Sequence, residues 1–118
     1  MILKEEMQKR LNKEPIFDEK ECKKILDEVQ KHFLELQKED NRKKYFWSAI
    51  VCFSTTVCLC DNLIDYKNTS KRILTKRLSK SEQKAGIEEI EKILKDQFTD
   101  IKPKEDNNYY ALELIIEL

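Results

Sequence analysis

Hydrophobic residues recur at three- and four-residue steps between Cys22 and Leu36, with Lys and Glu filling most other positions. On a helix these apolar positions fall within an arc of about 100°, which is the width of a core-facing stripe. Asp18 is followed three residues later by Glu21, the spacing of a capping box that satisfies free amides at a helix start. We therefore expect an amphipathic helix over about 18–40.

A second helix is predicted over about 80–98, where apolar residues from Ile87 to Ile101 follow the same spacing. Ser79 and Glu82 again have the spacing of a capping box. Gly86 lies inside this segment and should cost up to about 1 kcal/mol relative to Ala. Because a glycine in a helix lowers stability, its presence predicts that a neighbouring helix packs closely against this position.

The N-terminal residues predict a shorter amphipathic helix over 1–12. Leu3, Met7 and Leu11 are spaced by four, and the stretch that leads to Pro15 ends the pattern.

The stretch FWSAIVCFSTTVCLC, residues 46–60, carries no charge in a chain of which 39% is charged. Its β-branched and aromatic residues favour strands, and the serine and threonines in its middle could form a hairpin turn. Ser48, Thr55 and Asn62, spaced by seven, instead form one polar stripe on a helix. No Gly or Asn-Gly dipeptide supports a hairpin there, so we favour a buried central helix over 43–66.

The C-terminal segment YYALELIIEL is equally ambiguous, because its apolar residues match both a strand and a helix. A strand there would need a partner, which only residues 45–60 could provide. With one Gly and two Pro in 118 residues, we expect an all-α fold, a single domain over 1–118 with helices packed around the buried segment 43–66. The alternative is an α+β fold with a small sheet formed by 45–60 and 109–118.

The N-terminus lacks the apolar run of a signal peptide, and no segment has the roughly 20 apolar residues that cross a bilayer. We therefore expect a cytoplasmic protein without a membrane partner. Four cysteines in such a chain are expected to be reduced thiols rather than disulfides.

Candidate catalytic and metal-binding residues are few. Cys58 and Cys60 are separated by one residue, whereas structural zinc sites commonly use two cysteines separated by two or more residues and joined by a tight turn. His32 has no serine motif nearby in the sequence. Asp61 and Asp65 would share a helix face and could hold a cation, but a solvated helix end is the simpler interpretation. We expect no enzyme activity, no bound metal and no cofactor.

Residues 67–81 carry six basic residues and no acidic one, although the whole chain has zero net charge. If the segment continues as a helix over 69–84, its cations step along one face and would gain from an anionic partner. The candidate partner-binding residues are Lys71, Arg72, Lys76, Arg77, Lys80 and Lys84.

These observations predict a small non-catalytic protein-binding domain of the adaptor, inhibitor or immunity type. It would bind an acidic protein surface through charged helix faces, and pairing within the chain or with a second copy is the competing use of the same cations. The alternative is a nucleic-acid-associated protein that uses the basic segment 67–84. The chain's pI of about 6.6 makes nucleic acid the weaker choice.

Overall fold

The computed structural model describes residues 2–13 and 15–118 and, within the first helix, the side chains of residues 2–7. The elements in chain order are α1 (Ile2–Lys13), α2 (Glu19–Glu39), β1 (Tyr45–Cys52), β2 (Thr56–Cys60), α3 (Tyr66–Thr69), β3 (Lys71–Thr75), α4 (Lys80–Leu94), the 3₁₀ helix η1 (Lys95–Gln97), β4 (Asp100–Asp106) and β5 (Tyr109–Glu117).

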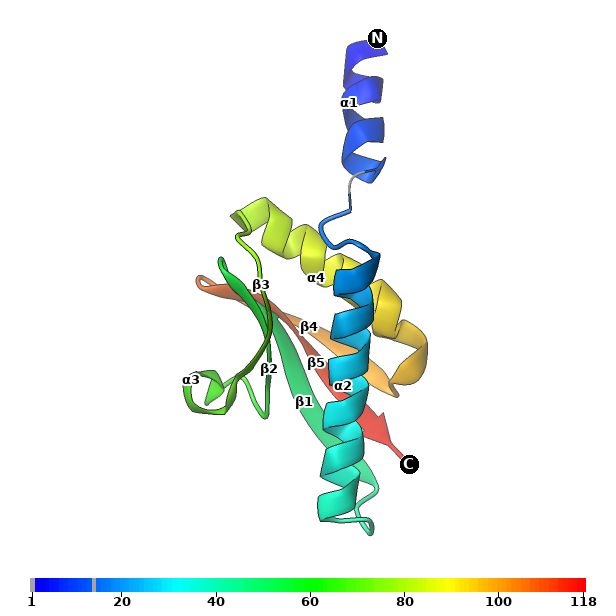
Figure 1. Ribbon diagram of the computed structural model, residues 1–118, viewed down its shortest axis with the longest axis vertical. Helices are drawn as coiled ribbons and strands as arrows, with labels where there is room; N and C mark the ends of the chain where they lie inside the picture. Colours follow the sequence, from blue (N-terminus) through cyan, green and yellow to red (C-terminus); the bar gives the residue numbers. More distant parts are fainter. Residues whose placement is uncertain (1, 14) are drawn as a thin grey trace.

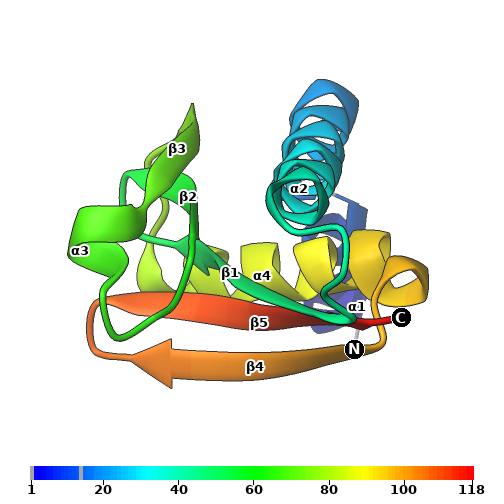
Figure 2. The ribbon, with the colours of Figure 1, turned by 90° about the horizontal axis from the view of Figure 1, so that it is seen from below.

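The five strands form one antiparallel sheet in the order β3-β2-β1-β5-β4, with β1 in the centre. Helices α2 and α4 lie on the same face of this sheet (Figure 2). Helix α1 projects away from the sheet at the opposite end from the C-terminus (Figure 1). The expected all-α, mainly helical fold is therefore wrong, and the α+β alternative describes the protein.

The two long helices are where the apolar spacing placed them. Both capping boxes are present, since Asp18 accepts from the Glu21 amide and Ser79 accepts from the Glu82 amide. Each glutamate also accepts from the backbone amide of its capping partner. Local sequence therefore decides where α2 and α4 begin.

The predicted helix over 43–66 is instead the hairpin β1–β2, followed by the short helix α3. The turn between the strands needs no glycine, because no described non-glycine residue adopts a positive φ. Two carbonyls of the turn accept hydrogen bonds from backbone amides outside the hairpin. The Leu78 amide donates to the Ser54 carbonyl at 2.7 Å, and the Lys76 amide donates to the Thr55 carbonyl at 2.9 Å. These bonds come from the segment before α4, so the hairpin depends on tertiary contacts that its own sequence does not show.

Most of the uncharged stretch is buried, because β2 and the second half of β1 are covered on both faces. Side chains such as Ile50 and Leu59 face α2 and α4, while Ala49, Val51 and Cys60 pack under Leu63 and Tyr66 of the segment that contains α3. A strand buried on both sides reads as a continuous apolar run without alternation. Among the described helices, none combines the length and apolarity that a membrane crossing requires.

The basic segment is also divided between elements. Residues 71–75 form the edge strand β3, and α4 begins only at Lys80, so no helix runs over 69–84. Strand β3 pairs with β2 through a register shift next to Cys58. The predicted row of cations along one helix face therefore does not exist.

Gly86 marks a close contact, although with the segment that leads into α2 rather than with the helix itself. A Cβ at this position would lie 3.0 Å from Cε2 of Phe17, whose side chain is 2% exposed. The Glu89 carboxylate, one turn along α4, accepts from the amides of Ile16 at 2.8 Å and Phe17 at 3.1 Å. Helix α4 therefore holds the segment before α2 in two ways: the Glu89 side chain binds its backbone amides, and Gly86 packs against the Phe17 ring.

Candidate functional site

Three of the six predicted partner-binding residues are engaged within the chain. Lys76 donates to the Ile16 carbonyl and, at 2.8 Å, to the Glu21 carboxylate, and its Nζ lies 5.6 Å from the centre of the Phe17 ring. Lys71 pairs with Glu28 of α2 at 3.7 Å. Pairing within the chain was the competing interpretation of these cations, and Lys76 fits it best because it is the least exposed of them.

Lys80 is the third engaged cation. Its Nζ donates to the Asn107 carbonyl and lies 5.6 Å from the centre of the Tyr110 ring. It therefore links the start of α4 to the β4–β5 turn. Because Lys80 is exposed, its charge also remains accessible to a partner.

Arg72, Arg77 and Lys84 are exposed and form no ion pair with another described residue. They lie on β3, on the connection after it and on α4, respectively. The structure therefore spreads the six cations over two elements and a loop, and no continuous basic strip results.

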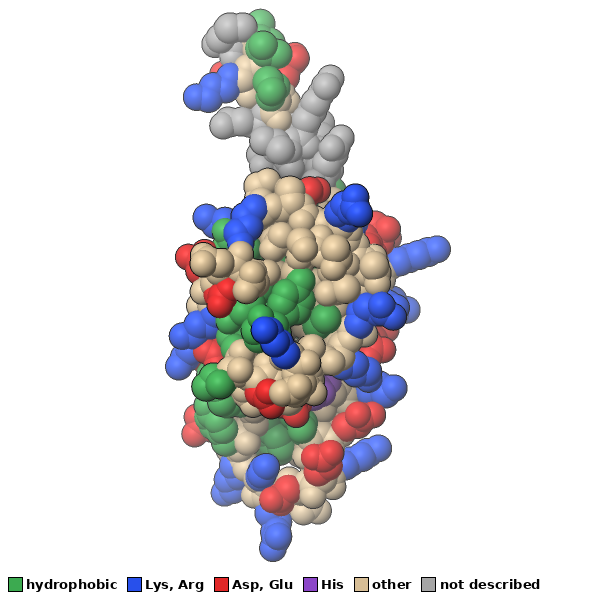
Figure 3. All heavy atoms as spheres, turned by 90° about the vertical axis from the view of Figure 1, so that its left-hand side faces the viewer, with side chains coloured by type: hydrophobic (Ala, Val, Ile, Leu, Met, Phe, Trp, Pro, Cys, Tyr) green, Lys and Arg blue, Asp and Glu red, His purple; other side chains and the backbone are tan. Residues whose placement is uncertain are grey.

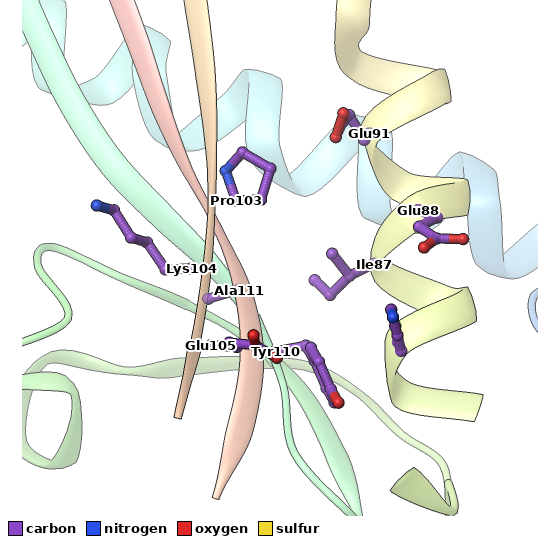
Figure 4. Close-up of a pocket in the computed structure, with 9 residues that line it drawn as sticks. Ile87, Glu88, Glu91, Pro103, Lys104, Glu105, Tyr110 and Ala111 are labelled. Carbon is purple, nitrogen blue, oxygen red and sulfur yellow. The ribbon is translucent and has the colours of Figure 1, made fainter. Parts of the chain in front are cut away.

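A pocket of about 380 Å³ lies between α4 and the β4–β5 hairpin (Figure 4). Ile87 points from α4 toward the strands and Tyr110 points back from β5, with Pro103 beside them. The charged residues around it have both signs: Lys84, Glu88, Glu91, Lys104 and Glu105. No His, Cys or Ser is among the residues that line it, so the pocket offers no nucleophile or general base from those groups.

His32 and Ser48 form the one described arrangement that resembles a catalytic pair. Ser48 is fully buried on β1, and its Oγ lies 3.0 Å from Nε2 of His32 on α2. The same hydroxyl donates to the Cys60 carbonyl at 2.6 Å. Because its single proton is committed there, Nε2 of His32 must donate to Ser48, which is the reverse of nucleophile activation. We interpret the pair as a structural link between α2 and the sheet.

The free energy of unfolding should decrease as the pH falls below 6.5, the ordinary pKa of a histidine side chain. Burial lowers the pKa of His32, so the unfolded chain binds this proton more readily than the folded one. The loss should begin near pH 6.5 and end below the folded-state pKa. Urea unfolding between about pH 7.5 and pH 5.5, where a histidine with an ordinary pKa changes charge, measures it. A His32→Gln variant should lose this pH dependence, and a variant as pH-dependent as the natural chain would assign it elsewhere.

The remaining candidates do not form a reactive site. All four cysteines are free, and burial raises the pKa of Cys52 and of Cys60 to about 12, which leaves both as unreactive thiols at neutral pH. Asp61 and Asp65 are exposed and lie on no common helix, because Asp65 is the N-cap residue of α3; its carboxylate accepts from the side-chain amide of Asn68 at 2.7 Å. The described residues contain no group of three or more potential metal ligands.

One half of the sheet face opposite α2 and α4 is uncovered. The α3 segment covers Ala49 and Val51, but Tyr45 and Trp47, further back along the same face of β1, remain 55% and 41% exposed. Trp47 lies directly opposite Ile115 of β5, so the two side chains share this face. We call Tyr45, Trp47 and Ile115 the aromatic face; Ile115 is only 9% exposed, so the two aromatic side chains form its accessible surface.

The surroundings of the aromatic face carry both charges. Lys104 of β4 pairs with Glu113 of β5 at 3.6 Å, and Lys102 lies opposite the same glutamate in the sheet. Hydrophobic side chains of the domain body likewise lie among basic and acidic ones in the space-filling view (Figure 3). The aromatic face is thus an apolar patch with a mixed-charge rim.

An uncharged groove lies on the other side of the same end of the sheet. It consists of two adjoining hollows of about 400 Å³ and about 110 Å³, whose linings share Phe33, Leu34 and Ile116. Its polar lining is provided by Gln30, Gln37 and Gln97, of which Gln30 donates to Gln97 at 2.8 Å. Its apolar lining consists of Phe33, Leu34, Phe46, Phe98, Ile116 and Leu118. We call this the glutamine groove.

Sequence reasoning missed both surfaces. The predicted buried helix over 43–66 places Tyr45 and Trp47 in the interior, whereas both are exposed on β1. Gln30 and Gln37 were the available signal for the groove, since they interrupt the Lys and Glu of α2 beside Leu34.

Comparisons of the chain with protein-family models, with curated proteins and with solved structures gave no match.

Proposed function

We propose that this protein is a non-catalytic domain that binds another protein through the aromatic face. The observation that supports this most is the exposure of Trp47, the chain's single tryptophan, on the central strand of the sheet. Tryptophan and tyrosine are the residues most enriched at binding hot spots, where a large rigid side chain enters a pocket of the partner. A mixed-charge rim around an apolar centre is also typical of protein interfaces.

The partner would meet the face of the sheet rather than extend it by another strand. Edge strand β4, DIKPKED, contains Pro103, which has no amide to donate, and five charged residues. Edge strand β3 has five residues, begins with Lys71 and Arg72, and is irregularly paired. Charges, proline and short length protect sheet edges against pairing with other chains. Lys71 and Arg72 of the basic segment therefore have a structural role, which is to protect the β3 edge of the sheet.

The remaining exposed cations, Arg72, Arg77 and Lys84, lie away from the aromatic face. Arg77 adjoins the β1–β2 turn at the other end of β1, and Lys84 lies on α4, which covers the opposite face of the sheet. They would attract an acidic partner at a distance and act mainly on the association rate. Nucleic acid is the weaker alternative, because it would require a continuous positive surface that binds several phosphates. The reversed hydrogen bond of Ser48 supports a non-catalytic role, and four free thiols suit a cytoplasmic location.

The test is site-specific photocrosslinking in the native host. A photoreactive phenylalanine analogue at Tyr45 should trap a protein, and the Trp47→Ala change in the same chain should reduce this crosslink at least tenfold. Truncation of a hot-spot residue costs about 2 kcal/mol or more, which is over tenfold in affinity. Crosslinked products are identified and quantified by mass spectrometry.

Leu34→Ala is the matched control, because Leu34 is an apolar residue that is more exposed than Trp47, at 61% against 41%, on the opposite side of this end of the sheet. It should leave the crosslink intact. A crosslink that survives Trp47→Ala, or one lost in Leu34→Ala alone, would contradict binding through the aromatic face. Binding to generic RNA or DNA that weakens steeply with salt would instead favour the nucleic-acid alternative.

A further inference from the structure

The exposed apolar side chains of this protein gather mainly at its two ends. Ile2, Leu3 and Met7 of α1 are 70%, 59% and 59% exposed, at one end of a molecule 58 Å long. The glutamine groove, with Leu34 and Leu118 exposed by 61% and 66%, lies toward the other end, beside the C-terminal half of α2 and the C-terminus (Figure 1).

Helix α1 needs an apolar partner. It has 12 residues, and isolated helices of this length are marginal in water. In proteins such helices are stabilised when their apolar stripe packs against another surface. Its described apolar side chains have no such packing, since each is more than half exposed.

The glutamine groove fits an apolar helix stripe better than a charged segment. None of the nine side chains that line it is charged, and a charged side chain placed there would lose its hydration without gaining an opposite side-chain charge. The glutamines can keep hydrogen bonds at its margin, as Gln30 and Gln97 do with each other. An amphipathic helix seated in an apolar groove is a recurrent mode of recognition.

The α1 helix cannot fill the groove of its own chain. Glu89 holds the amides of Ile16 and Phe17, so the chain is fixed just before α2. If α1 folded back along α2 from that point, its 12 residues would cover roughly 18 Å, whereas Leu34 lies roughly 22 Å along α2. The tip would reach only the level of Gln30, at the edge of the groove.

We infer that α1 docks into the glutamine groove of a second copy of this chain, and that a twofold axis makes the exchange reciprocal. One docked helix of this length buries on the order of 600–800 Å², whereas two related dockings reach the roughly 1,200 Å² of a stable interface. A twofold arrangement also closes the assembly, whereas a one-way contact would continue into a filament or ring. The inference concerns a different surface from the aromatic face and does not depend on it.

Sedimentation equilibrium over a range of concentrations tests the inference. The natural chain should give twice its 14.2 kDa mass. Two variants should each weaken dimerisation at least tenfold: Leu3→Glu with Met7→Glu on α1, and Leu34→Glu in the groove. Ile64→Glu, at a residue 97% exposed outside both surfaces, should dimerise like the natural chain. Circular dichroism on each variant confirms that the fold is retained.

An equimolar mixture of the α1 variant and the groove variant gives the decisive result. It should form a dimer more tightly than either variant alone, because the intact α1 of one chain meets the intact groove of the other. A monomeric natural chain, or a dimer that survives the α1 variant, would overturn the inference. Neither result would affect the Tyr45 crosslink, so the proposed function is tested separately.

Discussion

Replacing Gly86 by Leu should destabilise the protein by about 3 kcal/mol or more, because there is no room for a side chain between α4 and Phe17. Even a Cβ would lie 3.0 Å and 3.2 Å from two ring carbons of Phe17. The ring cannot move away easily, since it is buried and its backbone amide is held by Glu89. Overpacking of a fixed core site costs roughly 1–3 kcal/mol and sometimes more. Urea unfolding measures the loss.

Gly86→Ala is the graded comparison. Alanine gains up to about 1 kcal/mol of helix propensity over glycine, and the strain of its single carbon opposes this gain. We expect a net change within about 1 kcal/mol. In a double-mutant cycle, Gly86→Leu should lower the free energy of unfolding much less in a Phe17→Ala background than in the natural chain, because the ring that it clashes with is absent. Additive losses from Gly86→Leu and Phe17→Ala would show that the two residues do not contact each other.

The helices were predictable because their signals are local. Capping boxes and apolar spacing involve residues three or four apart, and α2 and α4 begin within one residue of the expected positions. Gly86 was predicted to mark a close contact for the same reason, since glycine inside a helix has a known cost. The identity of its neighbour, Phe17, was not predictable, because the two are brought together only by the tertiary fold.

The strands were not predictable because their pattern depends on what covers them. The sequence shows no alternation in β1, since the face opposite α2 and α4 is covered in part by the α3 segment. The low glycine content argued against hairpins, yet the β1–β2 turn is stabilised by amides from Lys76 and Leu78 and needs no positive φ. The correct pairing of 45–60 with 109–118 was available only as the alternative, because each segment is ambiguous alone.

The candidate site was predictable only in its charges. The six cations were visible in the sequence, but Lys71, Lys76 and Lys80 have partners 43, 55 and 27 residues away, respectively. The exposure of Trp47 could not be read from a run in which every neighbour is apolar. It follows from the short reach of the α3 segment, which covers one end of the sheet and leaves the other open.

Reversing the charge of Lys76 should destabilise the protein by about 2–4 kcal/mol, although the residue belongs to the basic segment. Lys76→Glu removes the donor to the Ile16 carbonyl and replaces the 2.8 Å bond to Glu21 by repulsion between two carboxylates. The side chains of Lys76 and Glu21 are 31% and 24% exposed, so solvent weakens this repulsion only in part. The cation over the Phe17 ring is lost as well. Urea unfolding is again the measurement.

Arg72→Glu and Arg77→Glu are the matched controls, because both arginines are exposed and form no ion pair with another described residue. Each should change the free energy of unfolding by less than about 0.5 kcal/mol, as surface substitutions usually do. Equal, small effects for all three reversals would mean that Lys76 is a solvated surface cation. If the expected difference is found, a partner-binding defect in Lys76→Glu would report damage to the fold. Arg72 and Arg77 are therefore the residues at which the basic segment can be tested for a direct role in binding.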